Sequence, residues 1–443
     1  MKLRNRIGLF LFVALIGLVI AGMVFGNQYV KAESKPVKLL VWGGVPPENG
    51  PQDVIDAFMK QNPDIKVEYF RYVNDDQGNL KLDTSLMGGE DIDVYFTYFD
   101  DLIVKRVQGG VAEDLTPYLK KERFSMKDNF GDGYFTIKNK IYSLPTAKEF
   151  IFTWANKNMF DKAKIAVPTA WTYDEYRAIT QKLTKTENGL KIYGGYLNWN
   201  NVCENILHTP KLGPNSLYQK NGTSNFTNPI FKDSINYMAD LMVKDKSHIS
   251  ILEAQTSKLA EYSQFLNQQS ATTAASLWIA RYINDTAKYP HDFKTVAIPF
   301  PTFKKGVGDY GWTGLNNHIM MNKNSKNKEA AWKFIKFWAT EGQIYMCRGG
   351  KLPSWKKINQ DEVIKRSLGP DADKLYDVES FKRVLFDSKV KLFVNTEITA
   401  YPQIKKVWKE EVEKVIGGQQ DVKQAVANAK RRADQEISNA KNR

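Results

Sequence analysis

Residues 37–43 read Val-Lys-Leu-Leu-Val-Trp-Gly, residues 65–70 read Ile-Lys-Val-Glu-Tyr-Phe, and residues 93–97 read Asp-Val-Tyr-Phe-Thr. The first stretch is an apolar run that ends in a glycine turn, and the second alternates apolar and polar side chains, so both are typical of β-strands. A helix is predicted from about Pro51, and another over about 80–87. This β-α-β-α-β order predicts a parallel sheet flanked by helices.

Polar and aromatic side chains follow two of these predicted strands. Trp42 stands at the end of the first strand, and Tyr98, Asp100 and Asp101 follow the third. Ligands of such sheets gather beyond the carboxyl ends of the strands. These residues are therefore candidates for a ligand site.

The chain is too long for one typical domain. Its 443 residues suit two lobes of roughly 150–200 residues each. The prolines in Ile298-Pro-Phe-Pro301 suit a segment that crosses between lobes, and Gly349-Gly350 breaks the chain again. The C-terminal third is predicted to be helical and to end in an Ala-rich helix over about 422–438. The tryptophans expected in the core, because they stand at helical spacing with other apolar residues, are Trp332, Trp338 and Trp408.

The N-terminus has the layout of an export signal. Basic residues precede an uncharged apolar run over residues 8–26, and Val30 and Ala32 place small side chains just before Glu33. Residues 1–32 are predicted to be a cleaved signal peptide, or an uncleaved anchor because about 19 apolar residues nearly span a bilayer. Either way, we expect the rest of the chain to be extracellular, at the outer face of the cytoplasmic membrane.

The chain is basic. Its formal net charge is +14, and residues 1–32 contain four of the positive charges and none of the negative ones. A net positive charge of this size suits binding to nucleic acid, to an anionic surface or to an anionic ligand. Export argues against a nucleic-acid partner. Two interpretations stay open: a protein that is soluble near an anionic cell wall, and one that binds a uronate-type sugar.

Local signatures of catalysis are absent from the sequence. It has no P-loop, Gly-x-Ser-x-Gly or His-Glu-x-x-His motif, and its 4 histidines are scattered. We therefore expect no enzymatic activity, no catalytic residues, no cofactor and no metal site. Cys203 and Cys347 could pair in an exported protein, but buried free thiols are favoured because two distant cysteines do not make a disulfide framework.

Short blocks of sequence occur in an order that is diagnostic of one family. The blocks are Lys38-Leu-Leu-Val-Trp-Gly43, Asp91-Ile-Asp-Val-Tyr-Phe96, Gly110-Val-Ala-Glu-Asp-Leu-Thr-Pro-Tyr118, Lys140-Ile-Tyr-Ser-Leu-Pro145, Trp154-Ala-Asn-Lys-Asn-Met-Phe160, Val167-Pro-Thr-Ala-Trp171, Asn324-Ser-Lys-Asn-Lys-Glu-Ala-Ala-Trp332 and Gly349-Gly-Lys-Leu-Pro353. Together they resemble the family 1 extracellular solute-binding proteins of ABC importers, whose best-known member is the maltose-binding protein. The family's Gram-positive members usually carry a lipobox cysteine, and the apolar segment here has none.

The resemblance implies an α/β, two-lobed periplasmic-binding-protein-like fold of type II, with the ligand cleft between the lobes and helices at the C-terminus. The implied ranges are 37–146 plus 302–349 for lobe 1, 147–301 plus 350–443 for lobe 2, and 145–149, 299–302 and 349–354 for the crossing strands. It implies a monomeric receptor that closes around a carbohydrate, in particular an oligosaccharide, and delivers it to membrane permease subunits.

A sugar presents hydroxyls around its edge, which suit carboxylates, amides and arginine. Glu149 aligns with a family position whose carboxylate reaches the ligand, and the alternative is a hinge salt bridge. Asp100 and Asp101 stand where the family places a polar ligand contact, or they cap a helix. Glu48 contacts the ligand or belongs to a solvated turn.

A sugar also presents C–H patches on its faces, which suit flat aromatic rings. Trp278 aligns with a stacking tryptophan of the family, and Arg281 is either a ligand fork or a helix-face charge. Trp199 and Asn200 lie in a stretch too polar for a core strand, which favours a cleft loop. Trp312 lies between glycines, which let the backbone approach a ligand closely. The remaining aromatic candidates, on the same stacking argument, are Trp42, Tyr98 and Trp355.

Two other functions stay open. A secreted enzyme that acts on polysaccharide, a glycosidase or lyase, would need catalytic carboxylates or bases that converge in the cleft, and such residues are far apart in a sequence. The same fold could instead serve a peptide or a metal, and a metal site would need clustered histidines or carboxylates.

Overall fold

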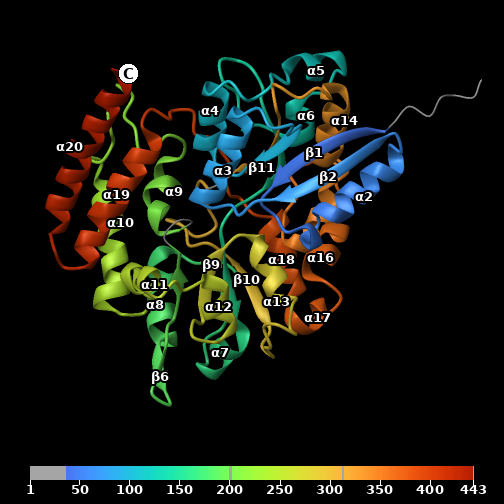
Figure 1. The fold of residues 1–443 in the computed structure, drawn as a ribbon. Coiled ribbons are helices and arrows are strands. Elements are labelled where there is room, and N and C mark those ends of the chain that lie inside the picture. The colour runs from blue at the N-terminus through green and yellow to red at the C-terminus, as the bar shows by residue number, and fades with distance from the viewer. Residues whose placement is uncertain (1–35, 199–201, 312–313, 443) are drawn as a thin grey trace, which may run out of the picture. The chain divides into compact units, whose positions relative to one another are not determined.

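The first sheet of the molecule follows the predicted strand–helix order (Figure 1). In the computed structural model its N-terminal elements are β1 (Val37–Gly43), η1 (Pro47–Asn49), α2 (Pro51–Gln61), β2 (Ile65–Arg71), α3 (Asp76–Met87) and β3 (Val94–Thr97). β1 and β3 pair in parallel, with Val41 beside Val94, as predicted. The structure describes residues 36–198, 202–311 and 314–442, and the chain from Lys38 onward forms one compact unit.

The first sheet is mixed, whereas the sequence predicted a parallel one. Its order is β2-β1-β3-β11-β4, and β11 (Leu315–Met321) runs antiparallel to both β3 and β4 (Leu144–Lys148). A strand from late in the chain is therefore inserted beside β3. The periodicity of residues 37–97 cannot show such an insertion.

Helices cover the first sheet and complete its core. Besides α2 and α3 they are α4 (Asp100–Gln108), α5 (Thr116–Lys121), α6 (Met126–Phe130), α14 (Lys328–Ala339) and α15 (Gln343–Met346). Trp332 and Trp338 of α14 are buried in this core, as predicted. We call this sheet with its helices the first lobe.

A second sheet has the order β10-β5-β9-β8 and defines the second lobe. Its strands are β5 (Phe152–Asn156), β8 (Tyr196–Leu197), β9 (Thr272–Ala275) and β10 (Thr295–Pro299). β5 is antiparallel to both β10 and β9, whereas β8 and β9 are parallel. A separate hairpin of β6 (Lys185–Glu187) and β7 (Leu190–Ile192) projects from this lobe (Figure 1).

The helices of the second lobe pack around two further apolar clusters. They are α7 (Lys157–Lys162), α8 (Tyr173–Leu183), α9 (His208–Leu212), α10 (Pro229–Ala239), α11 (Ile251–Thr256), α12 (Glu261–Leu266), α13 (Ala280–Ile283), α16 (Gln360–Leu368), α17 (Ala372–Leu375), α18 (Val378–Phe386), α19 (Tyr401–Ile416) and α20 (Val422–Lys441), with single turns η2 (Cys203–Asn205), η3 (Asp240–Lys244), η4 (Leu277–Ile279) and η5 (Cys347–Gly349). Thr172 caps α8 as predicted, because its side chain and that of Glu175 form a reciprocal capping box.

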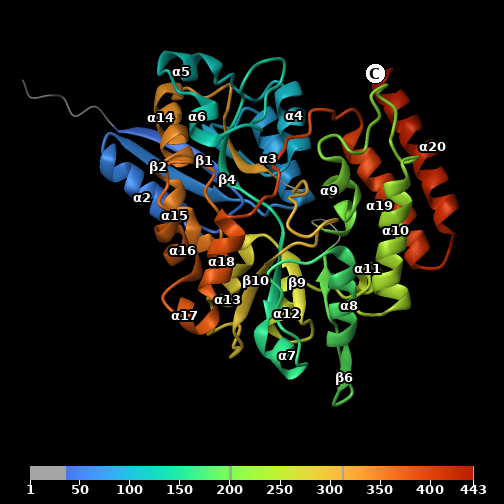
Figure 2. The same cartoon turned by 180° about the vertical axis from the view of Figure 1, so that it is seen from behind.

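The chain passes between the two sheets more than once. It leaves the first sheet after β4, enters the second at β5, and returns between β10 and β11. Seen from behind, α14 and α15 are followed by α16 and α18, which pack with the second lobe (Figure 2). These passages are the segments about which a hinge would turn, and the precise lobe boundaries stay a prediction.

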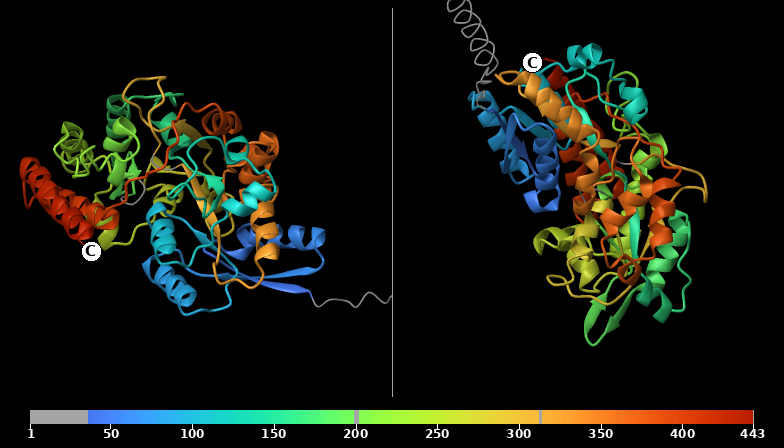
Figure 3. Two further views of the ribbon diagram at one scale, coloured as in Figure 1. Left: turned by 90° about the horizontal axis from the view of Figure 1, so that it is seen from above. Right: turned by 90° about the vertical axis from the view of Figure 1, so that its right-hand side faces the viewer.

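The C-terminal helices α19 and α20 pack against α10 (Figure 3). Trp408 of α19 is fully buried there, as predicted, and its ring lies 5.3 Å from that of Phe231. Besides Ile437, the buried positions of α20 are Ala425, Ala429 and Ala433. Their small side chains allow this otherwise polar helix to lie close to its neighbours.

Both cysteines are free and buried, which confirms the favoured interpretation. Cys203 lies in one core cluster of the second lobe and Cys347 in the other. Burial raises the pKa of the Cys347 thiol to about 12, so it is protonated at neutral pH. Within the described ranges, no helix is both long enough and apolar enough to span a bilayer.

Three histidines are buried in the neutral form. Burial lowers the pKa of His208 to about 3, of His248 to about 3 and of His318 to about 4. The pKa of an unfolded histidine is about 6.5. Below that pH the unfolded chain therefore binds protons that these buried side chains do not bind in the folded protein. The stability contributed by each histidine is present above pH ~6.5 and is lost as the pH falls towards its folded pKa, which is about 4 for His318 and about 3 for His208 and His248.

We expect His208→Phe to flatten this acid dependence. The His208 ring stacks 4.7 Å from Phe231, so phenylalanine keeps the packing and removes the titrating group. Between pH 7.5 and pH 5 the parent should lose about 2 kcal/mol more unfolding free energy than the variant. Urea unfolding at the two pH values measures this difference, and equal losses in both proteins would contradict the prediction.

Candidate ligand-binding site

A cleft between the lobes holds most of the polar side chains predicted to bind ligand. It encloses about 1770 Å³ of space that includes open solvent. Tyr98, Asp100, Asp101 and Glu149 line it from the first lobe and the passage after β4. The second lobe supplies Trp278 and Arg281, together with residues that sequence reasoning did not select. We call this space the interlobe cleft.

Tyr98 and the start of α4 bring the end of β3 to the interlobe cleft. The N–H of Gly44, just after β1, donates to the Tyr98 hydroxyl at 2.7 Å. A Cβ on Gly44 would lie 2.9 Å from the Tyr98 ring, so glycine permits this close approach. The ends of β1 and β3 thus hold Tyr98 in place.

Asp100 and Asp101 lie in the first turn of α4 and face charged groups of the second lobe. Burial, and then the like charge of Asp101, raise the pKa of Asp100 to about 7. On the opposite side of the interlobe cleft, two residues of the second lobe form an ion pair, with 3.1 Å between the Lys405 Nζ and the Glu204 Oε1. Asp100 is thus partly protonated at neutral pH, and a protonated carboxyl both donates to and accepts from a hydroxyl.

Aromatic rings line the second-lobe side of the interlobe cleft. Tyr262 and Tyr282 are stacked, with ring centroids 3.8 Å apart and an interplanar angle of 8°. Trp278 stands edge-on to both rings, at 6.3 Å from Tyr262 and 5.8 Å from Tyr282. The Arg281 guanidinium lies 5.4 Å from the centre of the Trp278 ring and 4.8 Å from that of Tyr282. This cluster offers rigid apolar faces next to a charged fork.

A segment of the chain that crosses between the lobes lies directly beside this aromatic cluster. Gly350 has a φ of 73°, which favours glycine, and a Cβ there would lie 2.5 Å from the Cα of Trp278. A side chain at position 350 would therefore displace the turn that carries Trp278. The glycine in the predicted crossing segment is needed for a close approach as well as for its φ.

Glu149 is both an ion-pair partner and a lining residue of the interlobe cleft. Its carboxylate lies 3.1 Å from the Lys351 Nζ and accepts hydrogen bonds from the side-chain amides of Asn316 at 3.3 Å and Asn317 at 3.2 Å. The two interpretations of Glu149, a hinge salt bridge and a polar cleft residue, therefore describe the same side chain. Its role towards a ligand stays a prediction.

Two of the predicted stacking residues lie away from the interlobe cleft. Trp42 is only 5% exposed, and its ring packs 4.3 Å from that of Phe70 in the first lobe. The Trp355 indole N–H donates to the Asn129 Oδ1 at 2.9 Å, and its ring packs against the same core. The structure thus uses both rings for packing. Glu48 borders an adjoining hollow, described below.

The predictions for Trp199, Asn200 and Trp312 lie outside the described residues. The lining residues that were not predicted from the sequence include Tyr262, Tyr282, Glu204, Asn316, Asn317, Lys351, Tyr401 and Lys405. Of these, Tyr282 carries a local signal, because it adjoins Arg281 in the stretch that already contained Trp278. Within 36–198, 202–311 and 314–442, no group of three His, Cys, Asp or Glu side chains is arranged to hold a metal ion.

The fold and the interlobe cleft define a two-lobed α/β binding protein. Residues 46–344 match the family described as "Bacterial extracellular solute-binding protein". The chain belongs to this family.

Individual relatives are similar along most of the chain. An uncharacterised ABC transporter extracellular-binding protein of Pyrococcus horikoshii is 24% identical over 329 residues, which are 70% of each chain. The galactooligosaccharide-binding protein of Bacillus subtilis is 21% identical over 83% of this chain and 85% of that one. Among solved structures, an ABC substrate-binding protein of Listeria monocytogenes in complex with cycloalternan has a TM-score of 0.75 at 21% identity, covering 91% of this chain and 99% of that one. This last likeness is one of fold.

Proposed function

We propose that the chain binds a carbohydrate in the interlobe cleft and does not alter it. The observation that carries the proposal is the meeting, in one cleft, of an aromatic cluster around Trp278 with carboxylates and amides around Glu149 and Asp100. Flat rings suit the C–H faces of a sugar, and carboxylates and amides suit its hydroxyl edge. A cleft with both kinds of group matches the two surfaces of a pyranose ring.

The relatives support the choice of ligand class. The Bacillus subtilis relative is named for galactooligosaccharides, and the Listeria monocytogenes structure holds cycloalternan. Both ligands are oligosaccharides, and the volume of the interlobe cleft, about 1770 Å³ with its open space, accommodates more than one sugar ring. We therefore propose an oligosaccharide as the ligand.

We propose that the protein serves as the receptor of an ABC importer, acting as a monomer outside the cytoplasmic membrane. Ligand would favour a closed arrangement of the lobes, and permease subunits would bind that closed form. Residues 1–32 would direct export, either as a cleaved signal or as an anchor. Mass spectrometry of the exported chain separates the two, because cleavage after Ala32 removes a defined mass.

A thermal-shift screen with neutral and acidic oligosaccharides tests the proposed function. A ligand at 100 times its dissociation constant should stabilise the protein by about 2.7 kcal/mol, seen as a saturable rise in Tm. Chromatography of the same mixtures should recover the oligosaccharide unchanged. New products would support a glycosidase or lyase instead, and no stabilisation by any sugar would contradict carbohydrate binding.

A further inference from the structure

The interlobe cleft continues into a second hollow, which we call the outer groove. Its empty volume is about 1080 Å³, including open solvent. The cleft and the outer groove share Asn74, Tyr98, Arg281, Tyr282 and Lys351, so the two spaces adjoin along these side chains. An oligosaccharide long enough to leave the cleft on this side would enter the outer groove.

The outer groove is lined by basic side chains that are not neutralised locally. Arg71, Arg281 and Lys288 line it, and among the described residues no carboxylate lies within ion-pair distance of any of them. A fourth cation, Lys351, is neutralised by Glu149 at 3.1 Å. These three cations therefore present unpaired positive charge to whatever occupies the outer groove.

The carboxylates of the outer groove are Glu48 and Asp285. Both are exposed, as are Arg71 and Lys288, whereas Arg281 is half-buried and less screened by water and salt. Asp285 also accepts the backbone N–H of Lys288 at 3.2 Å, which commits one of its oxygens to a turn. Two carboxylates face three cations, so they offset the positive charge of the outer groove only in part.

Arg281 is held in an orientation that suits an anionic group. Its guanidinium lies over the rings of Trp278 and Tyr282, and its Nη2 donates to the Tyr282 hydroxyl at 3.1 Å. A guanidinium restrained in this way loses little conformational freedom when it binds, and its remaining N–H groups match the oxygens of a carboxylate or sulfate.

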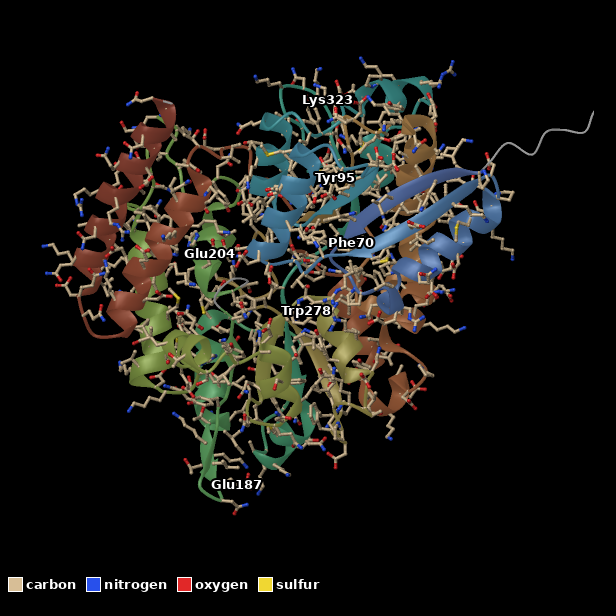
Figure 4. All side chains as sticks on the ribbon, viewed as in Figure 1. Phe70, Tyr95, Glu187, Glu204, Trp278 and Lys323 are labelled. Atoms are coloured by element: carbon tan, nitrogen blue, oxygen red, sulfur yellow. The ribbon has the colours of Figure 1, made fainter. Side chains whose placement is uncertain are left out.

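The far end of the interlobe cleft has the opposite character. Asp100, Asp101 and Glu204 gather there around Lys405. In Figure 4, Glu204 lies beside α19, whereas Trp278 lies beside α13. At the end around Lys405, an anionic substituent meets carboxyl groups that one lysine and the partial protonation of Asp100 offset only in part, whereas the end that contains Arg281 attracts it, so the charges favour one direction of binding.

We propose that the carbohydrate ligand is an acidic oligosaccharide whose carboxylate or sulfate group binds in the outer groove against Arg281, with Arg71 and Lys288 beside it. This inference rests on the proposed carbohydrate-binding function and names the chemical class of its ligand. It also selects, of the two interpretations of the basic charge, the one with an anionic sugar.

Calorimetry with matched pairs of oligosaccharides tests the proposal. The pairs are trigalacturonate with its methyl ester, a glucuronate-bearing xylo-oligosaccharide with its unsubstituted parent, and a sulfated galacto-oligosaccharide with its unsulfated parent. We expect the tightest ligand to be a charged member and to bind about 10-fold or more tightly than its neutral partner, with the advantage shrinking as salt is raised. The pair that shows the effect distinguishes carboxylate from sulfate.

Arg281→Met keeps much of the length of the side chain and removes its charge. This substitution should lower the affinity for the charged ligand by about 10-fold to 100-fold, and the affinity for its neutral partner by less than about 3-fold. Lys333→Gln, an exposed lysine of α14 outside both spaces, is the matched control for net charge and should leave binding unchanged.

The proposal would be overturned if the neutral ligands bound as tightly as their charged partners, or if Arg281→Met lowered the affinity for both members of a pair equally. Either result would leave the proposed carbohydrate binding intact. A panel in which no sugar binds, charged or neutral, would contradict the proposed function itself. An unchanged Tm for each variant confirms that the fold is not the cause of the difference.

Discussion

Replacing Asp83 by alanine is expected to destabilise the first lobe by about 3–5 kcal/mol, because it leaves a buried arginine without its counter-charge. Arg106 is only 2% exposed, and its Nε donates to the Asp83 Oδ1 at 2.8 Å. Its other N–H groups donate to the Thr97 hydroxyl at 2.6 Å and to the Asn79 Oδ1 at 2.9 Å. This network joins α3, α4 and the end of β3, immediately before the residues that line the interlobe cleft.

Urea unfolding of Asp83→Ala measures the loss. Asp161→Ala is the matched control, because Asp161 pairs with Lys157 at the surface and its removal should cost less than about 1 kcal/mol. Replacing both members, with Asp83→Leu and Arg106→Met, should cost less than Asp83→Ala alone, since no charge is then left buried. A loss below about 1 kcal/mol in Asp83→Ala would show that Arg106 is solvated in solution.

Trp278→Ala is expected to weaken binding of the carbohydrate by about 1–3 kcal/mol, a loss of roughly 5-fold to 150-fold. The ring belongs to the cluster with Tyr262 and Tyr282, where it offers a rigid face to a sugar. Its removal also takes away one of the two rings that restrain Arg281. Both effects act on the bound state, so the loss should exceed that from Trp278→Phe, which keeps an aromatic face.

Calorimetry with the tightest oligosaccharide of the screen measures this effect. Trp355→Phe is the matched control, because Trp355 packs in the first lobe and donates to Asn129 away from the interlobe cleft. It should change the stability and leave the affinity unaltered. Equal affinities for Trp278→Ala and the parent protein would place the carbohydrate elsewhere.

The opening of the fold could be predicted from sequence because local pattern determines it. Strands over 37–43 and 65–70 and the helix after Pro51 are where periodicity places them. The insertion of β11 beside β3 could not be predicted, since pairing between distant segments leaves no local pattern. The boundary of α3 shifted to Asp76 because the Asp75 side chain caps the helix by accepting from the Gly78 N–H.

The lining of the interlobe cleft was predictable where its residues are neighbours in sequence. Trp278 and Arg281 are three positions apart and share one turn of the chain, and both line the interlobe cleft. Glu204 and Lys405 meet only because α19 packs against η2. In the sequence of an amphipathic helix, a lysine that faces a ligand cleft looks the same as a lysine that faces solvent. Trp42 was predicted to stack on ligand from its place at a strand end, but Phe70 covers its ring instead.

A crystal structure of the protein with the tightest-binding oligosaccharide of the screen tests the central claim most directly. We predict one intact glycan between the lobes, with a ring against Trp278, hydroxyls within hydrogen-bonding distance of Glu149 or Asp100, and any acidic group beside Arg281. A glycan bound on another surface, or cleaved within the interlobe cleft, would contradict binding of an unaltered carbohydrate between the lobes.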